Sequence, residues 1–205
     1  MLSDKGFDLW ADGYDKTVGL SDEENSYPFA GYKEVLAGIY RSILVKGGAT
    51  VLDIGFGTGT LTQKLYEQGY EVWGQDFSGR MIELASAKMP NVHLFQGDFS
   101  KGLVEPLLGN SYDFIIATYS LHHLTDDNKV RLIQAMTDLL KKDGVLLIGD
   151  VAFTNREDLE RCRKEVGEEW DDDEIYFVFD ELKKIFPNLI FEQVSFCAGI
   201  LSLSW

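Results

Sequence analysis

The chain has 205 residues, enough for one domain with a sizeable core and a small appended cover. Hydrophobic residues make up 45% and charged residues 26%, as in ordinary globular domains. The net charge of −15 argues against nucleic acid and anionic membranes as partners, because phosphate binding needs clustered Lys and Arg.

The cysteines and the distribution of apolar residues indicate the cellular compartment of the protein. The two cysteines, Cys162 and Cys197, form neither a C-x-x-C pair nor a zinc pattern, so the sequence predicts no metal site and a reducing cytoplasm. The N-terminus carries early acids and no apolar run, unlike a signal peptide. No stretch approaches the roughly 18 consecutive apolar residues of a membrane span. We therefore expect a cytoplasmic monomer or homodimer.

The first predicted element is a helix over residues 3–17 with one aromatic face. Phe7, Trp10 and Tyr14 fall at i, i+3 and i+7 and therefore share a side. Such a face fits either core packing or a lid over a ligand, and the spacing alone favours core packing. A second helix is predicted over residues 29–45.

A turn rich in glycine joins the next two predicted elements, a buried strand over 49–54 and a helix over 60–68. Its glycines alternate along the chain at Gly55, Gly57 and Gly59. Glycine is favoured where the backbone turns sharply or approaches a ligand closely. The free N–H groups of a helix N-terminus attract anionic or polar groups. We therefore expect a ligand above the carboxyl end of this strand.

Two acids narrow the choice of ligand. Asp53 stands two residues before the first glycine, and a carboxylate there suits an ammonium group better than a pyrophosphate. Asp76 closes a second strand, predicted over 70–75, where an acid can accept hydrogen bonds from both hydroxyls of a ribose. The dinucleotide fingerprint G-x-G-x-x-G is not matched, because Thr60 holds the place of its third glycine.

Helices and strands keep alternating through the middle of the chain, which predicts a parallel sheet with right-handed crossovers. Ligands of such sheets bind beyond the carboxyl ends of the strands, where the strand order reverses, and the first and fourth strands would flank that point. Asp126 is the expected cap of the last helix in this series. The predicted elements are a helix over 78–89, strands over 92–95 and 112–117, a helix over 126–141 and a strand over 145–149.

Residues 155–175 interrupt this alternation. Asn155 can cap a helix, but the segment is mostly charged, and its acidic run 171–174 is typical of a solvated loop. The alternative is a flap that recognises a cationic or polar substrate. A helix over 178–186 and a hairpin with strands over 190–196 and 199–204 complete the chain.

The motif Asp53-x-Gly-x-Gly-x-Gly followed by Asp76 resembles the cofactor site of the Rossmann-like S-adenosylmethionine-dependent methyltransferases. The resemblance implies an α/β fold with a seven-stranded, mostly parallel, doubly wound sheet whose last strand is antiparallel. It also implies an N-terminal helical lid, residues 1–45, ahead of an S-adenosylmethionine-binding domain, residues 46–205. The family often carries a Phe-x-x-x-Ala-x-x-Tyr-Asp lid that excludes water from the ligand, matched here by Phe7, Ala11, Tyr14 and Asp15.

The nearest likeness is to small methyltransferases of the YrrT-like group, with Trp-Ala-x-x-Tyr-Asp near the start and Tyr-Ser-Leu-His-His-Leu after the fourth strand. The resemblance places the amino end of S-adenosylmethionine at Asp53, its ribose at Asp76 and its adenine near an acid with an adjacent apolar residue. A core role is the alternative for Tyr32 and Met81, and a capping role for Asp98. The residues expected around the cofactor are Tyr14, Tyr32, Asp53, Gly55, Phe56, Gly57, Gly59, Asp76, Phe77, Met81, Gly97, Asp98, Phe99 and Tyr119.

Methyl transfer from a sulfonium is an in-line displacement, so the protein mainly aligns donor and acceptor. A base is needed only for an acceptor that is protonated at working pH. His122 and His123 are candidates, although the residue pattern favours one bonding a backbone carbonyl while the other packs. We expect His123, with Tyr14 as a second candidate, in transfer to a small-molecule acceptor. A non-catalytic cofactor-binding regulator and a nicotinamide-dependent oxidoreductase remain as alternatives.

Overall fold

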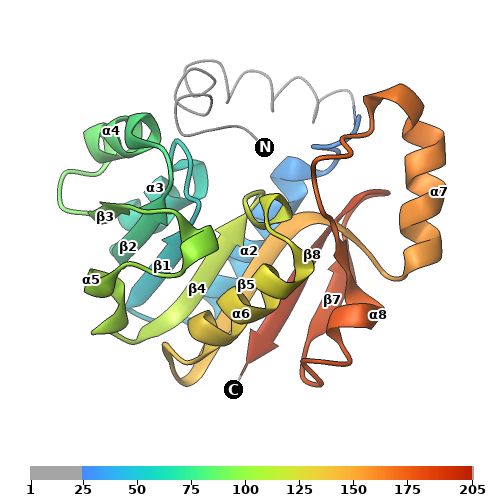
Figure 1. Ribbon diagram of the computed structural model, residues 1–205. Coiled ribbons are helices and arrows are strands. Elements are labelled where there is room, and N and C mark those ends of the chain that lie inside the picture. Colours follow the sequence, from blue (N-terminus) through green and yellow to red (C-terminus); the bar gives the residue numbers. More distant parts are fainter. Residues whose placement is uncertain (1–24, 205) are drawn as a thin grey trace.

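The computed structural model describes residues 25–204 (Figure 1). Seven strands form a central sheet in the order β3-β2-β1-β4-β5-β8-β7, and the short strand β6 pairs with β5 beside this path. Every pairing is parallel except those of β8, which is antiparallel to both β5 and β7. This confirms the mostly parallel sheet with an antiparallel last strand. The strands are β1 (Thr50–Ile54), β2 (Glu71–Asp76), β3 (His93–Gln96), β4 (Tyr112–Thr118), β5 (Leu140–Phe153), β6 (Phe177–Val178), β7 (Ile190–Gln193) and β8 (Ala198–Ser204).

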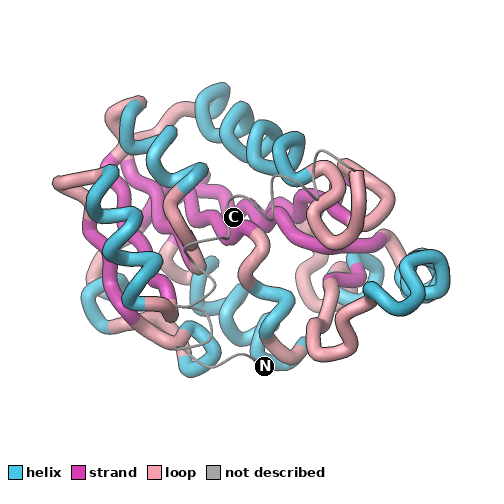
Figure 2. The backbone as a smooth tube through the Cα atoms, turned by 90° about the horizontal axis from the view of Figure 1, so that it is seen from above, coloured by secondary structure: helices cyan, strands magenta, loops and turns pink. Residues whose placement is uncertain are grey.

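Helices cover both faces of the sheet (Figure 2). One face packs against α2, α3 and α7, and the other against α5, α6 and α8. The helices are α2 (Tyr32–Lys46), α3 (Thr60–Glu67), α4 (Gly79–Lys88), α5 (Glu105–Leu108), α6 (Asp126–Thr137), α7 (Arg156–Val166) and α8 (Phe179–Leu182), with single 3₁₀ turns at η1 (Phe99–Lys101), η2 (Leu121–His123) and η3 (Gly167–Glu169).

Continuous apolar runs in the central strands explain this layering. Neighbouring residues of a strand point to opposite faces, so Val51 enters the core on the α2 side and Leu52 the core on the α6 side. Ile116 and Ile115 of β4 divide in the same way. A strand buried on both faces carries apolar residues at most of its positions, as parallel sheets generally show.

The predicted helix over 126–141 is too long. Helix α6 ends at Thr137, and Leu140 already belongs to β5, where it pairs with Tyr112. Its first turn is capped by Thr125, whose hydroxyl accepts from the Asn128 N–H at 3.4 Å, so the expectation for Asp126 is wrong. Burial of Leu140 decides the boundary, because pairing with β4 removes this apolar side chain from water.

Other element boundaries also differ from expectation. Strand β5 spans 14 residues, far beyond the predicted 145–149, because its later part pairs with β6 and β8. Helix α8 ends at Leu182 rather than at 186, and β7 ends at Gln193 rather than at 196. Strand β6 is an element that the sequence pattern did not reveal.

The aromatic segment predicted over 3–17, with Tyr14, lies outside the described residues. Within the described part of the chain, no helix has the length and apolar character needed to cross a membrane.

Candidate functional site

The glycine loop between β1 and α3 has a backbone that other residues adopt only with strain. Gly55, Gly57 and Gly59 have φ angles of 72°, 56° and 80°, in the left-handed region that glycine enters without steric cost. Space is also restricted, since a Cβ on Gly55 would lie 2.3 Å from the Cβ of Ser120, at the end of β4. The loop therefore packs directly against the carboxyl ends of β1 and β4, where the strand order reverses.

Asp53 is a buried acid that lacks part of its hydrogen bonding. Its Oδ2 accepts from the Thr62 hydroxyl at 2.6 Å, whereas its Oδ1 has no hydrogen-bond partner among the described residues. Burial, with a smaller contribution from the charge of Asp76, raises the pKa of Asp53 to about 7. A cavity of about 20 Å³ adjoins it, lined also by Tyr32 and Gly55. A cationic or hydrogen-bond-donating group of a ligand would satisfy the unpaired oxygen of this carboxylate, because a buried acceptor without a hydrogen bond is unfavourable in free energy.

Asp76 holds the glycine loop in place and is also the residue expected to bind a ribose. Its Oδ2 accepts from the Gly57 N–H and its Oδ1 from the Ser78 N–H, both at 2.9 Å. These bonds fix the glycine loop to the start of α4. A carboxylate oxygen can accept more than one hydrogen bond, so the expected contact of Asp76 with a ribose is compatible with these two bonds and stays a prediction.

The residues expected near an adenine gather beyond β2 and β3. Met81 is buried in the first turn of α4, and Phe77 lies between Asp76 and the Ser78 cap of that helix. Gly97 is the residue directly after β3. It packs closely against Val104, because a Cβ on Gly97 would lie 2.5 Å from the Val104 side chain. Phe99 reaches the glycine loop, with a ring carbon 3.5 Å from the position of a Cβ on Gly55.

Asp98 caps η1, which is the alternative that its loop position suggested. Its Oδ1 accepts from the Ser100 N–H at 3.0 Å, and its Oδ2 pairs with Lys101 at 3.0 Å. Burial opposes ionisation, but the bonds from Ser100 and Lys101 outweigh it and lower the pKa of Asp98. The carboxylate is partly exposed and keeps acceptor capacity for a ligand.

Aromatic side chains border the other side of the loop. Tyr119 packs against Tyr32 and Phe29, with ring centroids 5.0 and 5.5 Å apart. Tyr119 also has a positive φ of 50°, unusual outside glycine. Phe56 lines the cavity and packs into a small core cluster with α4. Tyr32 lines the cavity beside Asp53 and also packs against the core, while its contact with the cofactor stays a prediction.

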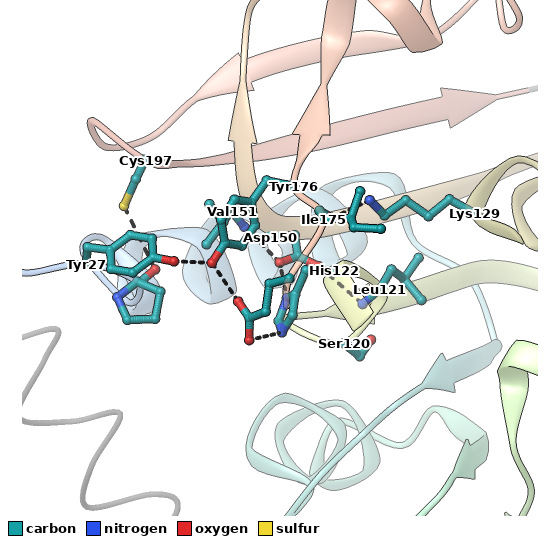
Figure 3. A network of polar contacts seen from close by, with 12 residues as sticks. Tyr27, Ser120, Leu121, His122, Lys129, Asp150, Val151, Ile175, Tyr176 and Cys197 are labelled. Carbon is teal, nitrogen blue, oxygen red and sulfur yellow. Dashed lines mark hydrogen bonds and ion pairs between the residues drawn. The ribbon is translucent and has the colours of Figure 1, made fainter. Parts of the chain in front are cut away.

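The two histidines occupy η2, directly beyond β4. The Nδ1 of His122 lies 2.6 Å from an oxygen of Asp150, and its Nε2 lies 3.4 Å from Glu174 (Figure 3). The expected bond from one histidine to a backbone carbonyl is therefore wrong for His122, which faces two carboxylates. Burial alone would lower the pKa of His122, but Asp150 and then Glu174 reverse this and raise it. Burial and the neighbouring His122 lower the pKa of His123 to about 3.

The sequence pattern did not predict the partners of His122. Asp150 stands inside β5 with a fully buried side chain, and its place after an apolar strand was the available signal. Glu174 belongs to the acidic run, where nothing in the sequence distinguishes it from its neighbours. Its Oε2 accepts from the Tyr176 hydroxyl at 2.7 Å, and that hydroxyl also contacts the Tyr27 hydroxyl (Figure 3).

Comparison with known proteins identifies the family. The profile described as a methyltransferase domain matches residues 51–144, which include the glycine loop and strands β1 to β4. An uncharacterized methyltransferase of Geobacillus sp. (strain WCH70) is 38% identical over 190 residues, covering 89% of this chain and 86% of that protein. The chain belongs to the Rossmann-like S-adenosylmethionine-dependent methyltransferases.

Solved structures share the fold of this methyltransferase. The S-adenosylhomocysteine-bound magnesium protoporphyrin IX methyltransferase of Synechocystis PCC 6803 has a TM-score of 0.68 at 20% identity, over 86% of this chain and 84% of that chain. An S-adenosylmethionine-dependent methyltransferase of Clostridium acetobutylicum has a TM-score of 0.70 at 16% identity, over 93% and 98%.

Family membership decides between the three functions that the sequence left open. The chain is a methyltransferase that uses S-adenosylmethionine, and the nicotinamide and regulator alternatives lose their support. The site fits this cofactor, because the orphaned Asp53 oxygen suits its ammonium group and the glycine loop offers a close backbone surface.

Proposed function

We propose that this methyltransferase transfers the methyl group of S-adenosylmethionine to a small-molecule acceptor. The buried Oδ1 of Asp53, which has no hydrogen-bond partner among the described residues, carries the proposal, because the ammonium group of the cofactor would satisfy it. The cofactor would then extend along the glycine loop, with its ribose at Asp76 and its adenine between Met81 and Asp98. In this pose the sulfonium lies near the carboxyl end of β4, beside Tyr119 and η2.

The charge of the chain supports a small acceptor. A net charge of −15 disfavours a nucleic-acid or membrane surface. The magnesium protoporphyrin IX methyltransferase, which has the same fold, acts on a small molecule by its name. Glu174 and His122 lie beyond the carboxyl end of β4, on the same side of the sheet as the glycine loop, and the carboxylate of Glu174 there favours a neutral or cationic acceptor with a donor group.

The chain supplies alignment and water exclusion, which are the main requirements of methyl transfer. The bound cofactor supplies an activated methyl group on a positively charged sulfur. Asp53 and Asp76 would hold its two polar ends, and the Tyr32 and Tyr119 rings would shield it from water. We also expect a cytoplasmic enzyme, active as a monomer or homodimer, within the YrrT-like group.

Calorimetry with S-adenosylhomocysteine tests the cofactor pose. Replacing Asp76 with Ala removes the ribose acceptors and should weaken binding by about 1–3 kcal/mol, the scale of hydrogen bonds to a charged group. Because Asp76 also fixes the loop, thermal unfolding of the variant is measured in parallel. Unchanged affinity in a folded Asp76→Ala variant would show that the ribose lies elsewhere.

A panel of candidate metabolites tests turnover. Release of S-adenosylhomocysteine from S-adenosylmethionine should appear with at least one small amine, phenol or acid. Turnover confined to nucleic acid or protein substrates would contradict the small-molecule proposal.

A further inference from the structure

Three potential metal ligands meet beyond β4, although the sequence predicted no metal site. The ligand atoms of His122, His123 and Glu174 all lie within 4.8 Å of one another. The His122 Nε2 and a Glu174 oxygen are 3.4 Å apart, and ligands around a tetrahedral zinc ion are separated by about 3.4 Å. This pair therefore already has a suitable spacing, and the ligand nitrogen of His123 lies within 4.8 Å of both other ligand atoms.

Two of these side chains, His122 and Glu174, are each held in orientation by a second polar partner. The Nδ1 of His122 lies 2.6 Å from Asp150, and the second oxygen of Glu174 accepts from Tyr176 at 2.7 Å (Figure 3). Histidine ligands of metals generally donate their other ring N–H to a carboxylate, and carboxylate ligands are themselves hydrogen-bonded. The Asp150 contact leaves the opposite nitrogen of His122 directed toward Glu174.

The segment that carries Glu174 is attached to the rest of the fold at several points. The Ile175 N–H donates to the His122 carbonyl at 2.8 Å, and the ammonium group of Lys129 donates to the Ile175 carbonyl. Strand β6 then pairs with β5 directly after this point. Glu174 is thus held beside η2 by backbone contacts, whereas its acidic neighbours at 171–173 are exposed.

We propose that His122, His123 and Glu174 bind one divalent transition-metal ion of the zinc class. Two imidazoles and one carboxylate form a donor set that suits zinc, cobalt and iron(II). Magnesium and calcium prefer oxygen ligands throughout. Three protein ligands leave a coordination position open to water or to a donor atom of another molecule.

The three ligands lie close to the glycine loop, which suggests what a bound ion would do. Ser120, two residues before His122, touches the glycine loop and donates to the Ile54 carbonyl at 2.9 Å. The cluster therefore lies at the same edge of the sheet as the cofactor loop. An ion there would position an oxygen or nitrogen of the acceptor. This role rests on the proposed methyl transfer, whereas ion binding itself does not.

Cobalt(II) titration of the full-length chain tests the site without a known acceptor. We expect one cobalt ion per chain, with visible absorption bands of a low-coordinate nitrogen and oxygen site, displaced by zinc. Glu174→Gln and His123→Gln should each weaken binding by about tenfold or more. Asp150→Asn removes the carboxylate that orients the His122 ring and should weaken cobalt binding by about 10–100-fold.

Two matched variants control for unspecific binding to this acidic protein. His93→Gln removes the exposed histidine of β3, and Glu169→Gln removes an exposed acid of η3. Both should bind cobalt as the unmodified chain does. Absence of the absorption bands, or equal losses in these controls and in Glu174→Gln, would overturn the site.

Folding of each variant is checked by its affinity for S-adenosylhomocysteine. Wild-type affinity in Glu174→Gln, together with lost cobalt binding, assigns the loss to the ligand and not to unfolding. Cobalt binding by a chain that shows no affinity for S-adenosylhomocysteine would refute the proposed cofactor pose and leave the metal site standing.

Discussion

Among single residues, Asp53 gives the cofactor site a dependence on pH. The pKa of its buried carboxyl is raised to about 7, so acidification protonates the group that would face the ligand ammonium. Affinity for S-adenosylhomocysteine should fall about tenfold or more between pH 7 and pH 5.5, a range in which an α-amino group stays charged. Calorimetry across this range checks the effect, and Asp53→Asn should bind weakly with a nearly flat profile.

The same group links pH to stability. The folded chain keeps the Asp53 proton up to about pH 7, whereas the ordinary pKa of this acid is 3.8. Its contribution to the free energy of unfolding is therefore full below about pH 4 and is lost as the pH rises through about 7. Urea unfolding of Asp53→Asn should lack this component, and an identical pH dependence in both proteins would contradict the assignment.

Gly55 offers a second test at the residue scale. Gly55→Ala would place a Cβ 2.3 Å from that of Ser120 at a φ of 72°, so both sterics and backbone conformation oppose it. Gly69→Ala has a similar φ of 87° with open space around it, and should cost only the backbone penalty of about 1–2 kcal/mol. Gly55→Ala should cost more and also weaken S-adenosylhomocysteine binding, as unfolding and calorimetry would show. Equal effects of the two substitutions would argue against close packing of the loop.

Among the elements, α6 holds the Glu174 segment through a buried cation. The side chain of Lys129 is 1% exposed, donates to the Ile175 carbonyl and lies 4.7 Å above the Phe177 ring. Lys129→Met would leave that carbonyl without its charged donor and should lower the free energy of unfolding by about 1.5–3 kcal/mol.

Hydrogen exchange locates the effect of this substitution. Amides of residues 175–178 should lose protection in Lys129→Met, while those of β1 and β4 keep it. Arg131→Met, at an exposed position of the same helix, is the control and should change neither measurement. Uniform loss of protection throughout the chain would mean that Lys129 supports the whole core and not this segment.

On the scale of the whole molecule, ligand binding should stabilise the fold. A ligand that binds only the folded chain adds about 2.7 kcal/mol to the free energy of unfolding at a hundred times its Kd. S-adenosylhomocysteine should therefore raise the midpoint of thermal unfolding, and NAD should not. A shift with NAD alone would contradict an S-adenosylmethionine site at the glycine loop.

The parts of the fold that the sequence determined are those with strong local signals. Apolar runs such as Val51 and Leu52 identified the buried strands, and the alternation of strands and helices predicted the parallel sheet. The positive φ angles of the glycine loop follow from its composition, because few other residues adopt them. The positions of Asp53 and Asp76 at strand ends predicted that both lie next to that loop, and the structure places them there.

Only the tertiary structure decided which distant residues meet. Leu140 leaves the predicted helix because pairing with Tyr112 buries it, a gain that local propensity does not contain. Glu174 is one acid in an acidic run until backbone bonds place it against His122. Sequence periodicity records which face of an element is apolar, but the contact of two polar side chains far apart in the chain depends on how the elements pack.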